Sequence, residues 1–510
     1  MNRSKALSFF PVLVLAIFSA SACSGPKGSI LCVGAACGGG TGTVAVTMVA
    51  DTLPAHPSLL TFQVTISSIT FTPTTGTAHS VTLSPALSVD LMRLQSDSTF
   101  LGTFKNIPAA QYSSVTLVLT GNANITFLND TGTTLTTSAT TNCPTNTVCP
   151  FIVAASSNPV ATVSYTVTQN AVTGIGIDLN YANAVSISGT TPTLAVNFSN
   201  TNVLSAFTLP RANSNLASGQ LDLIEDFTGV VTLSNSTATL AAATATGRGS
   251  LAATANSSTI FNSDPSQKLC LTPTSGQVSS CVSNNQFASM DVVLNSDGTL
   301  SIQEMEPLLG TLQDTVEGLV VSINTANTTQ FTMIVTDLVP AATNSLIGSL
   351  HVGDGLTVNL ASSVNPFLVD TKDLPVQSNW NSIFLDFSAK SDTTAIHLGQ
   401  TVAVHLTSFT AASGTTLASS QVDTVTLRWT RFTANTLSAA SPQFSINAFP
   451  SFFNVTGTAQ VQSFSTTNLD GISSTANLVV NNPLAMRALF IEDPTNTANP
   501  AVFAGKVRQH

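Results

Sequence analysis

Polar and apolar residues alternate along most of the chain, which is the pattern of β-strands with one buried and one solvated face. The alternation is clearest over residues 43–48, 60–67, 115–119, 163–167 and 175–179. Strands of this kind pack one face on a core and occur mainly in antiparallel sheets. Few stretches show the helical period instead. The sequence therefore predicts an all-β protein.

Turn-forming residues separate the apolar runs. Asp130-Thr131-Gly132, Asp297-Gly298 and Asp354-Gly355 stand between such runs, and hairpin turns favour Asp or Asn followed by Gly. Past Arg211 the pattern changes to smaller units, in which a Gly beside apolar residues opens each β segment. This change predicts a domain boundary near residue 212.

Residues 1–22 are organised like an export signal. Arg3 and Lys5 form a basic start, residues 6–20 are apolar, and Ala20-Ser21-Ala22 is a small-residue cleavage site. A permanent membrane helix needs roughly 20 apolar residues. Since the apolar stretch has only 15 residues, we expect the segment to be removed.

Cys23 follows this site directly, and the whole segment resembles a bacterial lipoprotein signal. The resemblance implies that Cys23 is lipidated and becomes the mature N-terminus. Ser24, in place of Asp, implies the outer membrane as the destination. Ala20 stands where such signals usually carry Leu, so ordinary cleavage and release of a free secreted protein is the alternative. Residues 23–42, with three consecutive glycines, form the predicted tether.

Charged residues make up only 8% of the chain, against roughly 25% in an average soluble protein. Neutral Ser, Thr and Asn residues must therefore supply most of the solvent-exposed polar groups. The formal net charge is −10, with 15 Lys and Arg residues that form no cluster along the sequence. Because nucleic-acid binding requires clustered cations to neutralise phosphates, we expect no nucleic-acid partner.

Seven cysteines are present, and six of them remain once Cys23 is assigned to the lipid. The six fall into close pairs along the chain, which in an oxidising compartment predicts three local disulfides closing short loops. A zinc site is the alternative, but no pair has the usual ligand spacing and no His lies nearby. The predicted pairs are Cys32 with Cys37, Cys143 with Cys149, and Cys270 with Cys281.

Four segments carry a family resemblance: Phe62–Ile69, Val89–Leu94, Ile107–Tyr112 and Gly174–Asn180. Through them, residues from about 43 to 211 resemble the bacterial exported proteins catalogued as domain of unknown function 4382. The resemblance implies a transthyretin-like β-sandwich and no inherited activity. Members usually carry Gly where this chain has Ala110. We expect Tyr112 to be structural, with its ring buried and its hydroxyl bonded at a sheet corner.

The segments past Arg211 more weakly resemble the small β-barrel modules catalogued as domain of unknown function 5666. Residues 351–358 and 397–404, which repeat one pattern, illustrate this likeness. The predicted organisation is a signal peptide (1–22), a lipidated tether (23–42), a β-sandwich (43–212) and three β-modules (213–312, 313–435 and 436–510).

Sequence motifs for known catalytic chemistry are missing: there is no nucleophile elbow, zinc-protease helix, phosphate-binding loop or calcium loop. His397 and His405 are a candidate metal pair across a hairpin, although solvated histidines are the simpler interpretation. Asp90 with Asp97, and Glu304 with Glu306, are paired carboxylates that solvation or turn capping explains. We therefore predict no catalytic residue, no cofactor and no metal.

The expected function is a non-enzymatic, lipid-anchored protein of the cell envelope that binds a polysaccharide or a surface-protein partner. The alternative is an extracellular hydrolase acting on glycans. Its carboxylates would come from the loops Asp90–Phe104 or Asn129–Cys149, with Asp90, Asp97 and Asp130 as candidates.

Overall fold

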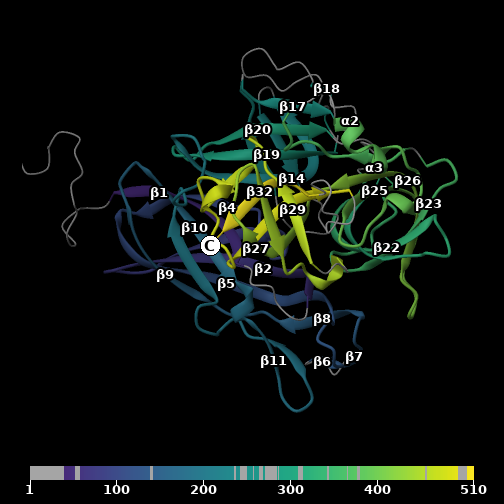
Figure 1. Cartoon of the computed structure of the whole chain (residues 1–510). Helices are drawn as coiled ribbons and strands as arrows, with labels where there is room; N and C mark the ends of the chain where they lie inside the picture. The colour runs from purple at the N-terminus through teal and green to yellow at the C-terminus, as the bar shows by residue number, and fades with distance from the viewer. Residues whose placement is uncertain are drawn as a thin grey trace, which may run out of the picture. The chain divides into compact units, whose positions relative to one another are not determined.

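Strands account for most of the chain, and the prediction of an all-β protein is confirmed (Figure 1). From Thr41 onward, the described residues belong to one compact unit. None of the helices in this part of the chain is long and apolar enough to span a bilayer. The computed structural model describes residues 40–51, 58–137, 142–234, 237–241, 250–256, 258–263, 268–269, 284, 287–307, 314–341, 344–364, 366–375, 380–453, 457–491 and 502–509.

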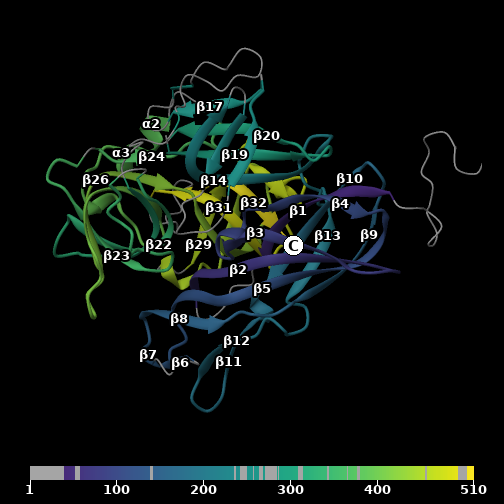
Figure 2. The same cartoon turned by 180° about the vertical axis from the view of Figure 1, so that it is seen from behind.

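Two sheets form the N-terminal sandwich. Their strand orders are β13-β10-β1-β4 and β3-β2-β5-β8, with β9 also paired to β5; a small sheet, β11-β12-β6-β7, is added to them. The long strands β2 and β5 lie side by side, as Figure 2 shows. The strands are β1 (Thr41–Asp51), β2 (Ser58–Pro73), β3 (His79–Asp90), β4 (Thr99–Pro108), β5 (Ala110–Leu128), β6 (Leu135–Thr137), β7 (Asn142–Cys143), β8 (Val148–Ala154), β9 (Val160–Val167), β10 (Val172–Asn180), β11 (Val185–Ser188), β12 (Thr193–Val196) and β13 (Leu204–Thr208).

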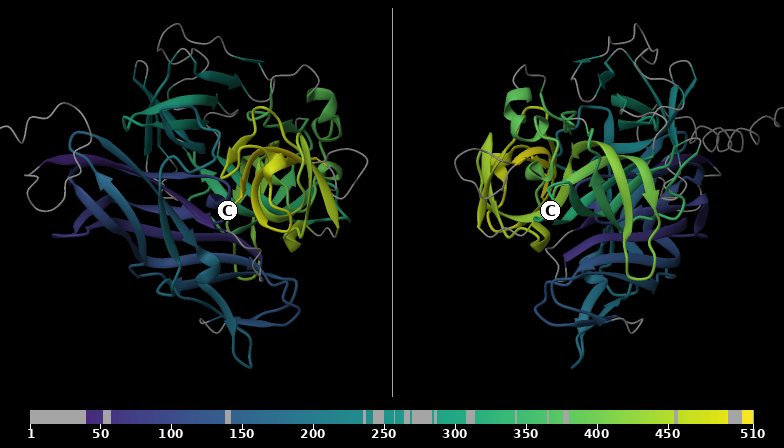
Figure 3. Two further views of the ribbon diagram at one scale, coloured as in Figure 1. Left: turned by 60° about the vertical axis from the view of Figure 1, so that its left-hand side comes forward. Right: turned by 90° about the vertical axis from the view of Figure 1, so that its right-hand side faces the viewer.

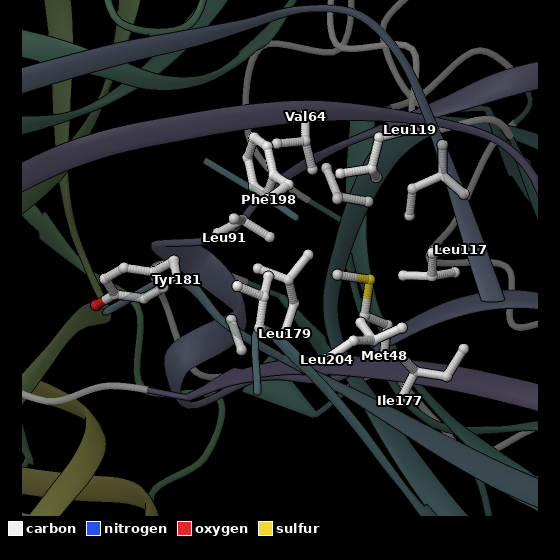
Figure 4. Packing of buried hydrophobic residues seen from close by; sticks show 14 of the residues in the cluster. Met48, Val64, Leu91, Leu117, Leu119, Ile177, Leu179, Tyr181, Phe198 and Leu204 are labelled. Atoms are coloured by element: carbon white, nitrogen blue, oxygen red, sulfur yellow. The ribbon is translucent and has the colours of Figure 1, made fainter. Parts of the chain in front are cut away.

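The sandwich core lies between these two sheets. Met48 and Ile177 of the first sheet pack with Val64 and Leu117 of the second in one apolar cluster (Figure 4). The predicted alternation is confirmed in β9, where buried and exposed residues alternate along the whole strand. The transthyretin-like assignment stays a prediction.

Strands β1 and β10 depart from the expected pattern because they are buried on both faces. They pair with each other in parallel inside their sheet, and the second face of β1 meets the following domain, whose apolar core includes Ala45. Strands covered on both sides are typical of parallel pairs. The expected solvated face is therefore wrong for these two strands.

Tyr112 has the predicted structural role. Its ring is buried and stacks on Tyr165 with the ring centres 5.2 Å apart, and its hydroxyl donates to the carbonyl oxygen of Pro108 at 2.9 Å. The Asp297-Gly298 turn is also confirmed, with Gly298 at a φ of 80° between two strands. At Asp354-Gly355 the prediction is wrong, because Gly353 takes the left-handed conformation and Gly355 begins a strand.

Three further sheets share one connectivity. If the five main strands of each are numbered in chain order, they are arranged 3-2-1-4-5, and the third and fifth strands pair in parallel to close the sheet. Figure 3 shows the last of these sheets, in yellow, curled into a ring. This is the connectivity of the five-stranded Greek-key barrel called the OB fold. The prediction of three small β-modules is confirmed.

The barrels follow one another along the chain, and each carries additional strands paired beside its fifth strand. The first barrel consists of β14 (Gln220–Ser234), β15 (Thr237–Ala241), β16 (Ser250–Thr254), β19 (Phe287–Asn295) and β20 (Leu300–Pro307), with β17 (Ile260–Ser263) and β18 (Lys268–Leu269) added. The second consists of β21 (Thr315–Ile323), β22 (Gln330–Val339), β23 (Gly355–Leu360), β25 (Thr401–Thr410) and β26 (Ala418–Arg428), with β24 (Leu368–Val369), α2 (Trp380–Ile383), α3 (Leu385–Ser388) and η4 (Thr393–Ala395). The third consists of β27 (Thr430–Ser438), β28 (Gln443–Asn447), β29 (Thr458–Gln462), β31 (Pro483–Phe490) and β32 (Val502–Gln509), with β30 (Asn468–Asp470), η5 (Ser451–Phe453) and η6 (Thr475–Asn477).

One of the three predicted disulfides lies in the described part of the chain and is confirmed. Cys143 and Cys149 are bonded, with their Cα atoms 6.0 Å apart. The bond closes the short loop between β7 and β8, which belong to different sheets, so it stabilises this connection locally. The other predicted positions, Cys23, Cys32, Cys37, Cys270 and Cys281, lie outside the described residues.

Candidate functional site

A cavity of about 270 Å³ lies where the sandwich meets the second and third barrels. This volume is close to the lower end of the roughly 300–1,000 Å³ typical of small-molecule sites. Its lining combines apolar side chains with about as many polar ones. The sandwich contributes Ser58, Leu59, Leu60, Asp90, Met92, Arg93, Gln95 and Tyr181; the second barrel contributes Glu317, Leu319, Thr336 and Thr401; the third contributes Arg431, Phe432, Thr433, Ala448, Phe449, Pro450, Ser451 and Phe452.

Gln95 connects the sandwich to the third barrel beside the cavity. It lies in the short helix η2 (Arg93–Gln95), which follows β3. Its Nε2 donates to the Tyr181 hydroxyl at 2.8 Å, and its Oε1 accepts from the Thr433 hydroxyl at 3.1 Å. Figure 4 shows the Tyr181 ring at the edge of the sandwich core, with its hydroxyl pointing away from the apolar side chains. The sandwich core thus places a polar atom at the cavity.

Residues 448–453, here called the rim segment, supply the aromatic part of the lining. Ala448 has a φ of 55°, a left-handed conformation that is uncommon for residues other than Gly. Phe449 is half-buried and Phe452 is buried. The Ser451 hydroxyl donates to Asp130 Oδ2 at 2.6 Å, and this oxygen also accepts from the Ser58 hydroxyl at 2.8 Å. Asp130 therefore ties the rim segment to the sandwich.

Several of the few cations of the chain have buried side chains, and Arg431 among them lines this cavity. Six of the 15 Lys and Arg side chains are at most 8% exposed, and each forms at least one ion pair. Such burial is costly unless every charge is compensated. These six are Lys372, Arg428, Arg431, Arg487, Lys506 and Arg508.

Asp226 is the centre of this buried ion network. It lies at an irregularity of β14 and has a φ of 50°. Its carboxylate pairs with Lys372, with Arg431 at 2.6 Å, with Arg487 at 3.1 Å and with Arg428 at 4.0 Å. Burial by itself would raise the pKa of Asp226, but Lys372, Arg487 and Arg431 outweigh it and hold the pKa well below its usual range. The carboxylate is therefore ionised and shared by two barrels.

Two guanidinium groups belong both to the cavity lining and to the network. Arg93 donates to Asp337 Oδ2 at 2.8 Å and to the carbonyl oxygen of Asp226 at 2.7 Å. Arg431 pairs with Asp97 and Asp226, and its Nη1 lies 3.9 Å from Glu317 Oε1. The ion pairs therefore orient the charged groups that the cavity presents.

A second group of charges joins the end of the chain to the sandwich. Arg508 pairs with Asp470 at 2.6 Å and donates to the carbonyl oxygens of Leu94 and Gln95 at 3.2 and 3.0 Å. Burial acts to raise the pKa of Asp470, but Arg508 and then Arg211 reverse this and lower it. Strand β32 thereby supports the turn that carries Gln95 into the cavity.

Three carboxylates of the network, Asp291, Glu304 and Asp373, have oxygens within 4.8 Å of one another. Lys372 Nζ is 2.9 Å from Asp291, and Arg487 Nη2 is 2.6 Å from Asp373. Burial raises the pKa of Asp373 to about 8 although Arg487 opposes it, and burial together with Asp291 raises the pKa of Glu304 well above its usual range. Lys372 and Arg487 therefore compensate two of the three carboxylates, Asp291 and Asp373.

The structure separates the carboxylates that the sequence singled out. Asp90 lines the cavity, but its Oδ1 accepts from the backbone N–H groups of Phe62 and Met92 at 2.8 and 3.0 Å. Asp97 is buried against Arg431, and Asp130 holds the rim segment. Glu304 belongs to the carboxylate cluster, whereas the side chain of Glu306 lies outside those described.

The suggested meeting of His397 and His405 across a hairpin is wrong. His405 lies within β25, and His397 precedes the same strand. A turn at residues 397–400, closed by the hydrogen bond that the Gln400 N–H group donates to the His397 carbonyl oxygen, precedes β25. Within β25, His405 lies opposite Thr315 and Thr424, so His397 is not its cross-strand neighbour.

Sequence analysis missed most of the cavity lining, including Gln95, Glu317, Thr336 and Arg431. A signal for part of it was present, since Glu317 and Arg431 interrupt apolar strand runs in a chain with very few charges. Charged residues at such positions are buried only when they are paired. The signal marks the positions but does not say which partners they find.

The fold and the cavity define the class of this protein. It is a β-sandwich followed by three OB-type barrels, and residues of the sandwich and of the second and third barrels line a ligand-sized cavity. Residues 41–198 match the family described as Domain of unknown function (DUF4382), which confirms that resemblance. The matched part contains the cavity residues Asp90, Met92, Arg93, Gln95 and Tyr181 but none of the barrels. Searches of curated proteins and of solved structures found no match. The likeness to domain of unknown function 5666 stays a prediction.

Replacing Asp226 with Asn should destabilise the protein strongly, because it leaves four buried cations without their shared anion. Breaking a buried ion pair costs about 3–5 kcal/mol, so we expect a loss of at least this size in urea unfolding, or a loss of soluble folded protein. Asp386→Asn, at an exposed carboxylate of α3, is the matched control and should change stability by no more than about 0.5 kcal/mol. Equal effects of both substitutions would show that the network is not required.

Asp373 should make stability depend on pH. Its pKa is about 8 in the folded protein, against an ordinary value of 3.8, so the folded state holds a proton that the unfolded state releases between about pH 4 and 8. This contribution is complete below the window and is lost as the pH rises to about 8, with a slope of at most about 1.4 kcal/mol per pH unit. Urea unfolding of Asp373→Asn from pH 4 to 9 should show a flatter dependence than the unsubstituted chain. Parallel curves for the two proteins would contradict the assignment.

Proposed function

We propose that this chain is a non-enzymatic, lipid-anchored protein of the cell envelope, and that the cavity is the site where it binds a glycan or a surface-protein partner. In this proposal the export signal and the lipid on Cys23 place the protein at the outer membrane. The tether, predicted over residues 23–42, separates the folded part from the membrane and ends where β1 begins at Thr41. The observation that carries the binding role is the cavity, with its apolar rings and its already paired charges.

The construction of the site supports binding. Its polar side chains other than Thr336 are held by ion pairs and hydrogen bonds, and such preorganisation favours recognition. The barrels have the connectivity of a fold that elsewhere binds oligosaccharides and oligonucleotides. That likeness is a fold-level analogy, and the shortage of clustered surface cations favours the saccharide over the nucleic acid.

Phe449→Ala should weaken retention of the full chain on immobilised envelope polysaccharide, because it removes a half-buried aromatic ring from the cavity. We expect roughly a tenfold weaker affinity, corresponding to about 1.4 kcal/mol, in binding isotherms measured with the protein in detergent. Leu385→Ala is the control, since Leu385 is 55% exposed in α3 and does not line the cavity. If the unsubstituted chain is not retained, or if Phe449→Ala is retained equally well, the proposal is wrong.

A glycan-acting hydrolase remains the second candidate because two carboxylates, Asp90 and Glu317, line the same cavity. Glycoside hydrolysis uses such a pair. Under our proposal the full chain releases no reducing ends from envelope polysaccharide. Release that is lost in both Asp90→Asn and Glu317→Gln, but kept in Asp386→Asn, would establish the hydrolase instead.

A further inference from the structure

The charged groups that line the cavity balance one another. Two are acidic, Asp90 and Glu317, and two are basic, Arg93 and Arg431. Both guanidinium groups are already paired with carboxylates, at 2.8 Å for Arg93 with Asp337 and 2.6 Å for Arg431 with Asp226. A charged ligand would have to compete with these buried pairs, and breaking them is costly. The lining therefore favours a ligand without net charge.

Polar groups at the cavity are suited to ligand hydroxyls. The Thr336 hydroxyl oxygen is buried and has no hydrogen-bond partner among the described residues. A buried polar atom usually has a partner, and one without it calls for an explanation. Gln95 Oε1 accepts one bond, from Thr433, while a carbonyl oxygen has two lone pairs. A hydroxylated ligand can satisfy Thr336 and use the second lone pair of Gln95.

The aromatic part of the lining suits a ring with an apolar face. Phe432, Phe449 and Phe452 line the cavity and belong to one group of contacting rings around Phe453. The C–H face of a sugar ring is apolar, so it can pack on such side chains while the ring hydroxyls reach polar groups. A charged or fully apolar ligand would satisfy only part of this lining.

The size and the rim limit how much of a glycan can enter. The volume of about 270 Å³ is small for a ligand site. The hydrogen bonds that Ser451 and Ser58 donate to Asp130 join the rim segment to the sandwich at the cavity. A ligand that enters with one end fits this arrangement better than a chain that passes through.

We infer that the cavity binds one uncharged, hydroxylated ring, namely the terminal sugar residue of a neutral glycan. Thr336 and Gln95 bind its hydroxyls, and the phenylalanine rings pack on its apolar face. This inference rests on the proposed function and names the class of ligand for the same site. It makes Thr336 a specificity-determining residue.

The test is calorimetric titration of the full chain in detergent with neutral disaccharides (cellobiose, maltose and lactose) and with the charged disaccharide digalacturonic acid. We expect at least one neutral probe to bind and the charged probe to bind at least tenfold more weakly. Thr336→Val keeps the side-chain shape, so it should leave the fold intact and weaken neutral binding by about tenfold through loss of one hydrogen bond. Thr162→Val, at an exposed position of β9, should leave the affinity unchanged.

The outcomes separate this inference from the proposed function. Equal or tighter binding of digalacturonic acid, or neutral binding that Thr336→Val does not weaken, overturns the inference. Retention of the chain on envelope polysaccharide through Phe449, without binding of any neutral disaccharide, also overturns it while the proposed function stands. Absence of both polysaccharide retention and disaccharide binding overturns the two together.

Discussion

The arrangement of this protein depends on the compensation of buried charge at Asp226. A carboxylate out of water is tolerated only beside cations, and here the cations come from the second and third barrels. In addition, Arg93 of the sandwich binds the carbonyl oxygen of the same residue. Because desolvation offsets much of the attraction in such pairs, we regard the network chiefly as a specificity device. All four of these cations are compensated only when the barrels pack so that each cation reaches Asp226.

This constraint also shapes the cavity. Arg93 and Arg431 present guanidinium groups there, yet the anions of the network already bind them. The same pairs hold the side chains in place before any ligand arrives. A site built in this way offers preorganised polar atoms with no net charge. The unusual charge distribution of the chain thus bears directly on what the site can recognise.

The structure explains the low content of charged residues. Many of the charged residues are used inside the molecule, and neutral hydroxyl and amide side chains solvate the exposed strand faces, as β9 illustrates. Thr is a good strand residue that needs no counter-ion. The polar residues of the chain therefore fall into two groups. Charged residues form the buried ion network, and neutral polar residues cover the exposed strand faces.

Much of the fold could be predicted because its signals are local. The alternation of side chains has the same period as the strand itself, so the strands of the sandwich and the barrel modules were recognisable. The Cys143–Cys149 bond and the turn at Gly298 also join residues close in sequence. By contrast, the two-sided burial of β1 was not predicted, since it depends on the neighbouring barrel.

Most residues of the candidate site could not be predicted from local patterns in the sequence. Asp90 and Asp130 attracted attention as carboxylates, but their roles, accepting backbone N–H groups and holding the rim segment, follow from contacts. Arg431 and Asp97 are 334 positions apart in the chain, and no periodicity connects such residues. The sequence by itself determined strands, turns and short-range bonds, because those depend on neighbours along the backbone. The tertiary structure alone decided which charges meet and where a cavity remains, because both depend on how the separate sheets pack.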